Sequence, residues 1–513
     1  MTGYKTIASA SLALLALGVM TATATRDVSH ADTMASDTVS LASAPPITAL
    51  PNVIVMVIDD ATVEDIRYMP NVQSILVDKG TTFAHNYVPL SVCCPARATI
   101  LTGQYPHNHG VLDNTPPRGG FPAFDDTNTL ATYLDPAYAT SLVGKYLNSM
   151  PDQMYIPPGW DDWRSPTNGS TYNYTFQYQN VNGVQTSFSG YMPETHGRQS
   201  RAFLSSVPLE QPFFSYVGWV APHAGSPEEP HDLSSSPFVS KKYRGSYTGP
   251  RVPSGASFNE ADVSDKPQFI KDLPVLGKKE LLAVKQRLVQ RRESLMAVDH
   301  QVGKIVADVA VRGQLDNTYF IFLSDNGQMQ GEHRLPRRKG LAYEPSSRVP
   351  LIIRGPGFPS GLRYTNVTGL QDVVPTILDV TDQSLPVGAP QPDGVSLLGL
   401  IEGSVKTTRV QSLELAENAG LTDQQVEAGV RPSKREVSKL TDSRASWSLR
   451  GLVTNNRWKY VVYPAMREVE MYNLAIDPDE LTNLHGRDRY ARQQDRLAGL
   501  LQRYRSCAGL TCR

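Results

Sequence analysis

Polar residues follow four apolar segments of this 513-residue sequence, each at the point where the segment ends. The segments are residues 53–58, 141–143, 213–220 and 319–323, and they are followed by Asp59-Asp60, Gly144-Lys145, Ala221-Pro222-His223 and Ser324-Asp325-Asn326, respectively. Continuous apolar runs of this kind are typical of strands that are buried on both faces of a sheet. Because open α/β sheets bind ligands beyond the carboxyl ends of their strands, we predict that these polar residues converge on one site.

Four of these residues offer only oxygen ligands to a metal ion, namely Asp59, Asp60, Asp325 and Asn326. Oxygen donors suit the hard cations Ca²⁺ and Mg²⁺ better than they suit zinc. An Asp-Asp pair can instead cap a helix, and the sequence Asp325-Asn326-Gly327 can form a turn. The presence of both pairs after separate buried strands favours the metal site.

A metal site with three carboxylates needs additional positive charge, because one dication leaves part of the negative charge uncompensated. Arg97, Lys145 and Lys339 are the candidates to supply it. The same cations would suit a substrate with a tetrahedral oxyanion.

The elements that must position these residues follow an α/β pattern. Residues 288–309 form a helical pattern with Leu288, Leu295, Val298, Val302 and Ile305 on one face. Residues 172–179 and 184–188 flank Asn182-Gly183 and predict a β-hairpin. The stretch 223–266 is rich in Pro, Ser and Gly, which predicts a long loop at the rim of the site.

The C-terminal part of the sequence has a different pattern. Residues 405–443 are polar and weakly patterned, whereas residues 449–453, 458–463 and 469–472 are typical of short strands. A final helix is predicted over residues 490–504. We therefore predict a small antiparallel sheet with a helix at this end of the chain.

Composition excludes several classes of protein. The chain has 49 Lys and Arg residues against 50 Asp and Glu residues, which gives a formal net charge of −1. A protein that binds a nucleic-acid backbone needs a strong basic excess, so no nucleic-acid partner is expected. The apolar content of 40% is too high, and the net charge too low, for a disordered chain.

The chain has only four cysteines, so it is not a disulfide scaffold. Cys507 and Cys512 are predicted to close a small disulfide loop if the protein is exported. Cys93 and Cys94 are adjacent, and a bond between neighbours is strained. No further cysteine or histidine pair stands at the spacing of a structural zinc site, so these two cysteines need another explanation.

The N-terminal residues predict export. Lys5 precedes an apolar run over residues 7–20, and Ala22, Thr23 and Ala24 follow it. This order is typical of a secretory signal peptide over residues 1–24, and residues 25–48 are predicted to be a flexible linker. The apolar run is too short for a comfortable membrane span, although an uncleaved anchor is an alternative.

The adjacent cysteines belong to a motif. The segment CCPAR, residues 93–97, contains the pattern C-x-P-x-R, and Leu101-Thr102-Gly103 follows it. Further segments are NVIVMVIDD, GKYLN, APH, SDNGQMQGEHRLP, RVPLIIRGPG and DPDELTNL. In this order they resemble the type I, formylglycine-dependent sulfatases of the alkaline phosphatase superfamily. The Cys-Cys-Pro form with His107-Asn108-His109 is most similar to the branch of the glucosamine-6-sulfatases, the heparan endosulfatases and their arylsulfatase relatives.

This resemblance implies an alkaline-phosphatase-like α/β fold: a large, mixed and mostly parallel sheet flanked by helices, with a smaller C-terminal antiparallel sheet and helix. It implies a sulfatase catalytic domain over residues 49–404 and a C-terminal subdomain over residues 405–513. The implied activity is hydrolysis of sulfate esters. The implied substrate is a small molecule or glycan with an aryl or sugar O-sulfate, and N-acetylglucosamine 6-sulfate is one candidate. We expect a secreted or extracytoplasmic protein without a stable membrane span.

In the family, the cysteine of C-x-P-x-R is oxidised to Cα-formylglycine (3-oxoalanine), and the spacing selects Cys93 rather than Cys94. A formylglycine-generating enzyme is therefore an implied partner for maturation. The implied ligands of Ca²⁺ or Mg²⁺ are Asp59, Asp60, the modified Cys93, Asp325 and Asn326. The implied catalytic residues are Cys93, Arg97, Lys145, His223 and Lys339, and the implied substrate-binding residues are Lys145, His223, Lys339 and His109.

By the same resemblance, one hydroxyl of the aldehyde hydrate at position 93 attacks sulfur, Asp325 helps to deprotonate it, and Arg97 holds its oxygens. Lys145, His223 and Lys339 match residues that bind the sulfate or assist the leaving group. When the alcohol has left, the second hydroxyl loses its proton, C–O cleavage expels sulfate, and the aldehyde returns.

Two questions stay open at the level of sequence. Many sulfatases have a histidine two residues after the lysine that matches Lys145, where this chain has Leu147. His107 or His109 could replace it, could contact the sugar, or could be a structural histidine. The alternative functions are a phosphodiesterase or phosphonate monoester hydrolase on the same fold, and a non-catalytic, exported glycan-binding protein with an unmodified Cys93.

Overall fold

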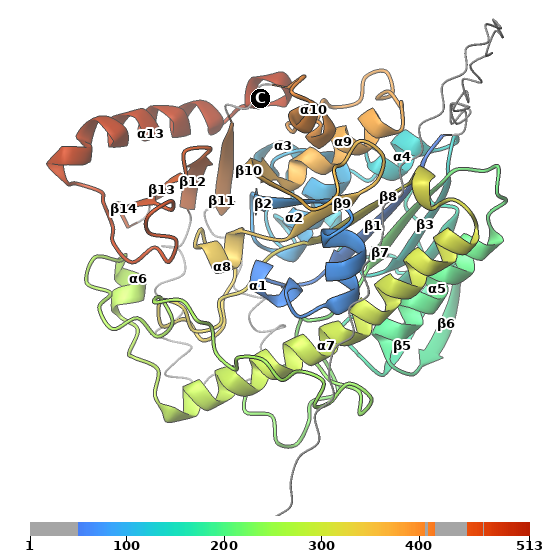
Figure 1. The fold of residues 1–513 in the computed structure, drawn as a ribbon, viewed down its shortest axis with the longest axis horizontal. Helices are drawn as coiled ribbons and strands as arrows, with labels where there is room; N and C mark the ends of the chain where they lie inside the picture. Colours follow the sequence, from blue (N-terminus) through green and yellow to red (C-terminus); the bar gives the residue numbers. More distant parts are fainter. Residues whose placement is uncertain (1–49, 406–408, 416–448, 465) are drawn as a thin grey trace, which may run out of the picture. The chain divides into compact units, whose positions relative to one another are not determined.

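The computed structural model describes residues 50–405, 409–415, 449–464 and 466–513 (Figure 1). The predicted signal peptide, residues 1–24, and the predicted linker, residues 25–48, lie outside the described residues, as do residues 416–443 of the polar stretch. Among the described helices, none has both the length and the apolar character that crossing a membrane requires.

Ten strands form one mixed sheet in the order β10-β2-β9-β8-β1-β7-β3-β4-β5-β6. The strands are β1 (Asn52–Ile58), β2 (Thr81–Tyr87), β3 (Ala139–Gly144), β4 (Asp162–Thr167), β5 (Phe176–Val181), β6 (Val184–Ser189), β7 (Phe213–Gly218), β8 (Thr318–Ser324), β9 (Leu351–Arg354) and β10 (Leu362–Gly369). The central strands β8, β1, β7, β3 and β4 are parallel. Antiparallel pairs involve β9 on one side and β5 and β6 on the other. This mixed, mostly parallel centre confirms the predicted fold class.

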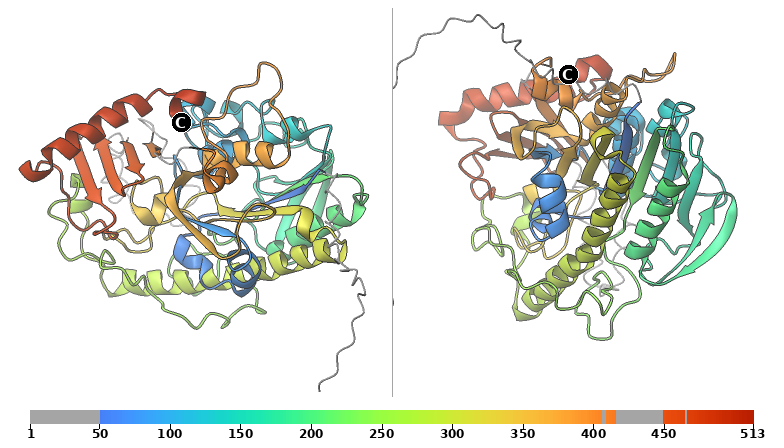
Figure 2. Two further views of the ribbon diagram at one scale, coloured as in Figure 1. Left: turned by 45° about the horizontal axis from the view of Figure 1, so that its top comes forward. Right: turned by 45° about the vertical axis from the view of Figure 1, so that its right-hand side comes forward.

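The four apolar segments of the sequence are all strands of this sheet, namely β1, β3, β7 and β8. Every residue of β1 and of β8 is buried, because helices cover both faces of the sheet (Figures 1 and 2). Alternate residues of β1 therefore enter two different cores. Val53, Val55 and Val57 belong to one of them, whereas Ile54, Met56 and Ile58 belong to the other.

Two groups of helices supply the outer layers of these cores. The first group is α2 (Cys93–Thr102), α4 (Leu130–Leu134) and α9 (Val373–Val380). The second group is α5 (Met192–Ser206) and α7 (Lys278–Val311), which pack on each other. Helix α7 begins at Lys278, well before the predicted start at Leu288. The sequence pattern did not reveal these first turns, because they are rich in charged residues and show no apolar period.

The remaining helices are short, apart from the C-terminal one. They are α1 (Val63–Ile66), α3 (Pro106–His109), α6 (Gln268–Lys271), α8 (Glu344–Ser347), α10 (Leu397–Glu402) and α13 (Ala491–Tyr504), with a π-helix at Val72–Val77 and 3₁₀ turns at Phe121–Ala123, Leu315–Asn317, Leu370–Asp372, Asp488–Tyr490 and Gly509–Cys512. Residues 219–267, all of which are described, contain neither a helix nor a strand, in agreement with the predicted long loop.

The predicted hairpin is formed by β5 and β6, with Asn182 and Gly183 both at positive φ (51° and 85°). Two consecutive residues in this region define the two-residue turn that matches the twist of a hairpin, which explains the Asn-Gly sequence. Strand β4 pairs with β5 and was not predicted from the sequence. Its polar and proline-containing sequence, DWRSPT, does not resemble a buried strand.

A second, antiparallel sheet of four strands confirms the predicted C-terminal sheet. Its strands are β11 (Val410–Leu415), β12 (Leu449–Thr454), β13 (Trp458–Tyr463) and β14 (Glu468–Asn473). Leu497 and Tyr504 of α13 share an apolar core with residues of this sheet. Strand β11 lies in the stretch that the sequence left unassigned, because its buried residues include the polar Gln411 and Glu414. Cys507 and Cys512 form the predicted disulfide.

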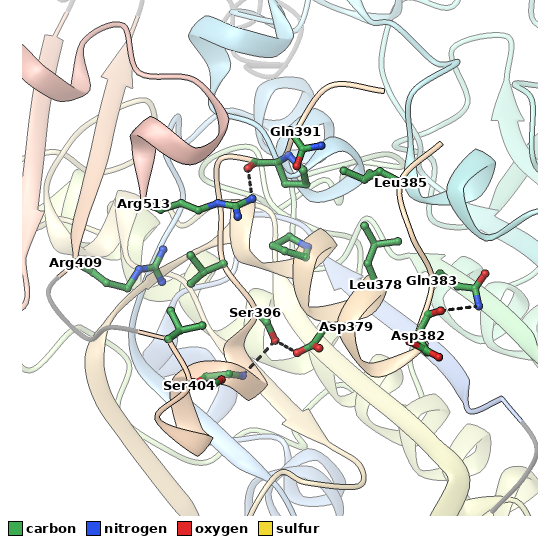
Figure 3. A pocket seen from close by; sticks show the side chains of 15 residues that line it. Leu378, Asp379, Asp382, Gln383, Leu385, Gln391, Ser396, Ser404, Arg409 and Arg513 are labelled. Atoms are coloured by element: carbon green, nitrogen blue, oxygen red, sulfur yellow. Dashed lines mark hydrogen bonds between the residues drawn. The ribbon is translucent and has the colours of Figure 1, made fainter. Parts of the chain in front are cut away.

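A cavity of about 780 Å³ lies between α9, α10 and the C-terminal Arg513 (Figure 3). Asp379 and Ser396 hydrogen-bond to each other in its wall, and Arg409 is held there by an ion pair with Asp372. None of the residues predicted to do chemistry lines this cavity.

Candidate active site

The predicted strand-end residues converge beyond the carboxyl ends of the central strands. Asp59 and Asp60 follow β1, Lys145 follows β3, His223 lies beyond β7, and Asp325 and Asn326 follow β8; all six are buried. The parallel register of β1 with β7 and β8 aligns these ends. Ligand atoms of Asp59, Asp60, Cys93 and His223 all lie within 4.8 Å of one another.

The turn after β1 is locked in an uncommon conformation. Asp60 has a φ of 70°, a region that residues other than glycine seldom adopt. Its backbone N–H donates to Asp325 Oδ1 at 3.3 Å, and the next N–H, of Ala61, donates to Ser324 Oγ at 2.9 Å. The backbone N–H of Asp59 donates to the Ala221 carbonyl at 3.2 Å. Three strand ends thus fix the direction of the two aspartate side chains.

Cys93 is the first residue of α2, and its side chain faces the carboxylates. Its Sγ lies 3.6 Å from Asp59 Oδ1 and 3.0 Å from Lys339 Nζ. Burial, together with the charge of Asp59, raises the pKa of the Cys93 thiol well above its ordinary value. An unmodified Cys93 is therefore a neutral thiol, and a neutral thiol is a poor nucleophile.

Cys94 points away from this cluster, because successive side chains on a helix are about 100° apart. Its Sγ accepts a hydrogen bond from the backbone N–H of Asn148 at 3.1 Å and lies in the core beneath α2. Its own backbone N–H donates to Asn114 Oδ1 at 2.7 Å. Only Cys93 of the two cysteines meets the aspartates.

Arg97 lies one helical turn after Cys93 on the same face of α2. Its Nε donates to Asp325 Oδ2 at 2.8 Å, its Nη1 to the Lys145 carbonyl at 2.8 Å, and its Nη2 to Asp59 Oδ2 at 3.5 Å. The guanidinium group is fully buried and joins three strand ends. It therefore orients the carboxylates of the cluster.

Two lysine side chains reach the aspartates from different segments. Lys145 Nζ lies 2.5 Å from Asp59 Oδ2, and Lys339 Nζ lies 2.9 Å from Asp60 Oδ1. Their side chains are only 1% and 8% exposed, respectively. Lysine is rarely buried to this extent unless its charge is paired. Burial alone would lower the pKa of Lys145, but the charge of Asp59 raises it well above its ordinary value.

The surroundings shift the pKa values of two carboxyl groups in opposite directions. Burial alone would raise the pKa of Asp59, but Lys145, His223 and Arg97 outweigh it and hold that pKa well below the usual range. Burial and the neighbouring charge of Asp59 raise the pKa of Asp325 to about 6. The protein's own cations thus do not stabilise all of the negative charge that the site can carry.

The donor set fits a hard divalent cation. Asp59 and Asp60 lie in one group with Cys93 and His223, Arg97 links Asp325 to Asp59, and Asn326 contacts Asp60; the three carboxylates and the amide offer oxygen. Asn326 Nδ2 donates to Asp60 and to the Gly327 carbonyl, whereas its buried Oδ1 has no hydrogen-bond partner among the described residues. A buried acceptor without a donor is costly, and a cation beside it would remove that cost.

A family model described as "Sulfatase" matches residues 51–383, which include the whole cluster. The chain belongs to the sulfatase family. It is thus a sulfuric ester hydrolase, as the motifs predicted.

Curated relatives extend the likeness beyond this range. The sulfatase is 28% identical over 507 residues to N-acetylglucosamine-6-sulfatase of Homo sapiens, an alignment that covers 91% of this chain and 86% of that protein. It is 32% identical over 368 residues to the extracellular sulfatase SULF-1 homolog of Drosophila melanogaster, which covers 68% of this chain and 31% of the longer relative.

Solved structures share the fold at lower identity. One is a protein in complex with its substrate D-glucosamine-2-N,6-O-disulfate, with a TM-score of 0.66, 23% identity, and coverage of 88% of this chain and 97% of that one. Another is the phosphonate monoester hydrolase of Agrobacterium radiobacter, with a TM-score of 0.62, 21% identity, and coverage of 89% and 95%. These likenesses establish the alkaline-phosphatase-like architecture of this sulfatase.

The structure does not bring His109 to the cluster. Its Nε2 lies 3.1 Å from Thr99 Oγ1, and its Nδ1 accepts from the Val111 N–H at 3.1 Å. Burial, and then the charge of His107, lower the pKa of His109 to about 3, so it is neutral at physiological pH. Both ring nitrogens thus have partners, Thr99 of α2 and the backbone of Val111, which is an arrangement typical of a structural histidine.

His107 also lies outside the cluster. Its Nδ1 lies 2.5 Å from Glu414 Oε1 and its Nε2 lies 2.9 Å from the Cys507 carbonyl. It connects α3 to β11 and to the C-terminal disulfide loop. Leu147, at the position where many sulfatases have a histidine, is buried in the core. Neither His107 nor His109 therefore replaces that histidine at the cluster.

Three residues of the site were not found from the sequence. Gln328 Nε2 donates to Asp60 Oδ2 at 3.0 Å, and Arg291 Nη2 donates to the Asp60 carbonyl at 2.5 Å. Tyr172 stacks on the ring of His223. Gln328 stands two residues after Asn326 in the same motif, which was a usable signal. Arg291 lies on a helix and Tyr172 in an irregular segment, both far from this motif in the sequence. Neither residue had a signal in the sequence that pointed to the site.

Proposed function

We propose that this sulfatase hydrolyses a sugar or aryl O-sulfate, with N-acetylglucosamine 6-sulfate as the first candidate, and that it uses formylglycine at position 93 and Ca²⁺ or Mg²⁺. The observation that carries the proposal is the buried contact of Cys93 with Asp59 and Lys339 at the N-terminal end of α2. The identity of 28% to an N-acetylglucosamine-6-sulfatase over most of the chain supports the choice of substrate.

Asp59, Asp60, Asp325, Asn326 and the modified residue 93 would hold the cation. The formylglycine hydrate would supply a nucleophilic hydroxyl. The dication, when bound, would supply Lewis-acid polarisation of oxygen. Asp325 would accept a proton from the group at position 93, a role that a carboxylate can perform in this position. Arg97 would keep Asp325 in place through its 2.8 Å hydrogen bond.

Charge supports an anionic substrate. Asp59, Asp60 and Asp325 carry at most three negative charges, and Arg97, Lys145 and Lys339 carry three positive ones. A dication would leave the site with excess positive charge, which favours binding of a sulfate monoester. Lys145 and Lys339 would move from the aspartates to the sulfate oxygens, because the cation then neutralises those aspartates.

His223 would serve the leaving group. Its Nδ1 lies 2.6 Å from the Ala224 carbonyl and so carries a proton, which leaves Nε2 directed toward the cluster, 3.8 Å from Asp60 Oδ2. A protonated imidazole in this position would donate from Nε2 to the alcohol oxygen as the S–O bond breaks.

We further propose that the protein is exported. The predicted signal sequence over residues 1–24 and the C-terminal disulfide support this, because disulfides persist in oxidising compartments. A relative that is 32% identical is described as an extracellular sulfatase SULF-1 homolog.

The test of the proposal joins mass spectrometry to an assay. We expect the peptide that contains residue 93 to have the mass of an aldehyde in place of a thiol when the protein is produced with a formylglycine-generating enzyme. We expect the same preparation to release sulfate from N-acetylglucosamine 6-sulfate or from an aryl sulfate. An unmodified thiol with no turnover would favour the glycan-binding alternative. Faster turnover of a phosphonate monoester would favour the alternative of a phosphonate monoester hydrolase, an enzyme class in which a similar fold occurs.

Lys145→Ala and Lys339→Ala are each expected to lower kcat/KM by about a hundredfold, because one well-placed donor contributes about 3 kcal/mol to an anionic transition state. The measurement is steady-state turnover of an aryl sulfate, with the melting temperature as the folding control. Lys304→Ala, at an exposed position of α7, is the matched control and should leave the rate unchanged. Rates like the wild type in either site variant would remove that lysine from the mechanism.

A further inference from the structure

Tyr172 lies between β4 and β5, in a segment that forms one wall of the site. Its ring stacks on the imidazole of His223, with ring centres 4.5 Å apart and planes at 28°. Lys145 Nζ lies 4.9 Å from the centre of the same ring. Two groups that the proposed function places on the substrate thus share one aromatic neighbour.

Hydrogen bonds fix the segment of Tyr172 to the segment of His223. The Tyr172 carbonyl accepts from the Ser226 N–H at 2.9 Å, and the Ser226 carbonyl accepts from the Tyr174 N–H at 2.8 Å. Tyr174 Oη donates to the His223 carbonyl at 2.6 Å. Gly225 permits this close approach, because a Cβ atom there would lie 2.2 Å from the Tyr172 carbonyl oxygen. The distance between the phenol ring and the imidazole is therefore set by the backbone.

The side chain of Tyr172 is anchored at its far end as well. Its Oη lies 3.3 Å from Asn148 Oδ1, to which it donates. Asn148 is itself fixed, since its backbone N–H donates to Cys94 Sγ in the core. The ring therefore presents a fixed flat surface to His223.

The stacked ring of Tyr172 contributes to the orientation of the His223 imidazole. The hydrogen bond of 2.6 Å to the Ala224 carbonyl fixes Nδ1 but permits the ring to tilt about that bond. Asp60 Oδ2 lies 3.8 Å from Nε2, on the side of the ring that faces the cluster. A flat contact on one face of the ring opposes the tilt and so directs Nε2.

We propose that Tyr172 is a positioning residue of the sulfatase reaction, whose ring holds His223 so that Nε2 is aimed at the leaving oxygen. This inference rests on the proposed function, in which His223 protonates the alcohol. As the S–O bond breaks, its electron pair passes to the alcohol oxygen, which takes the proton from Nε2 and leaves a neutral imidazole. Tyr172 touches neither the substrate nor the proton, and it acts through His223.

The inference predicts a dependence on the leaving group. A phenol with an electron-withdrawing substituent leaves without much help, whereas an unsubstituted phenol or a sugar alcohol needs the proton. Misplacing Nε2 should therefore slow poor leaving groups far more than good ones. A merely structural role for Tyr172 would lower both rates by the same factor.

The experiment compares 4-nitrophenyl sulfate with phenyl sulfate. Tyr172→Leu is expected to lower kcat by about threefold on the first substrate and by roughly a hundredfold on the second, as expected for a displaced general acid. Tyr172→Phe keeps the ring and should restore the phenyl sulfate rate to within about threefold of the wild type. If Tyr172→Leu melts early, Tyr172→Met, which fills more of the space, replaces it.

Two controls keep the inference falsifiable. Tyr178→Leu removes a ring that packs on Phe176 at 4.9 Å in the same hairpin, and it should change neither rate. In a His223→Ala background, Tyr172→Leu should add little further loss, because both changes remove the same function. Equal losses on the two substrates, additive effects in the double variant, or a change confined to KM would each overturn the positioning role. Failure of the proposed function is distinct, because the wild-type protein would then hydrolyse neither sulfate.

Discussion

Cys93→Ala is expected to abolish sulfate ester hydrolysis, with a loss of about five to six orders of magnitude, as is usual when a nucleophile is removed. The physical reason is position, since Cys93 alone of the two adjacent cysteines faces Asp59 and Lys339. Cys93→Ser should be equally inactive, because a serine sulfate ester has no aldehyde-forming route for release. The measurement is turnover of an aryl sulfate, combined with the mass of the peptide that contains residue 93.

Cys94→Ala is the matched control for this prediction. Its side chain is fully buried in the core and touches the backbone of Asn148, not the carboxylates. Removing a buried sulfur should lower the free energy of unfolding by about 1 kcal/mol and leave kcat/KM nearly unchanged. Equal loss of activity from Cys93→Ala and Cys94→Ala would show that the choice of register between the two cysteines is wrong.

The central sheet and the strand-end cluster could be predicted from the sequence because both depend on strong local signals. Strands β1 and β8 are continuous apolar runs, and the residues that follow them must lie at one edge of a parallel sheet. Strands such as β4 and β11 could not be predicted, because their side chains are polar and show no strand pattern. Their backbones are instead held by pairing with neighbouring strands. Their place depends on neighbours that are distant in the sequence.

The histidines illustrate the limit for the site. His107 and His109 stand next to the motif, yet their partners are Glu414 and Thr99, and neither ring turns toward Asp59. His223 stands much further along the chain and does reach Asp60. Proximity to the motif in the sequence therefore did not predict a place at the cluster, whereas position after a buried strand did. Tyr172 has neither signal, because the role we propose for it depends on its contact with His223.

Asp325→Ala is expected to lower kcat/KM by roughly a thousandfold or more, because a bound dication contributes several kcal/mol to catalysis. Asp325 also holds Arg97 at 2.8 Å and accepts from the Asp60 N–H, so its loss leaves buried groups unpaired. Asp325→Asn keeps the volume and the acceptor oxygen, and it separates the loss of charge from the loss of packing. Both variants should fail in turnover, whereas the second should keep its fold.

Cation binding gives this prediction a readout that does not depend on turnover. Ca²⁺ or Mg²⁺ should raise the melting temperature of the wild-type protein, since a ligand that binds only the native state stabilises it. Asp325→Asn should lose most of that rise, whereas Asp316→Ala, at an exposed position just before β8, should retain it. Asn326 Oδ1, which is buried and has no hydrogen-bond partner in the described part of the chain, is the reason to expect a hard cation at this point. Stoichiometric zinc in the active protein, or full activity in Asp325→Asn, would contradict an all-oxygen site for a hard dication.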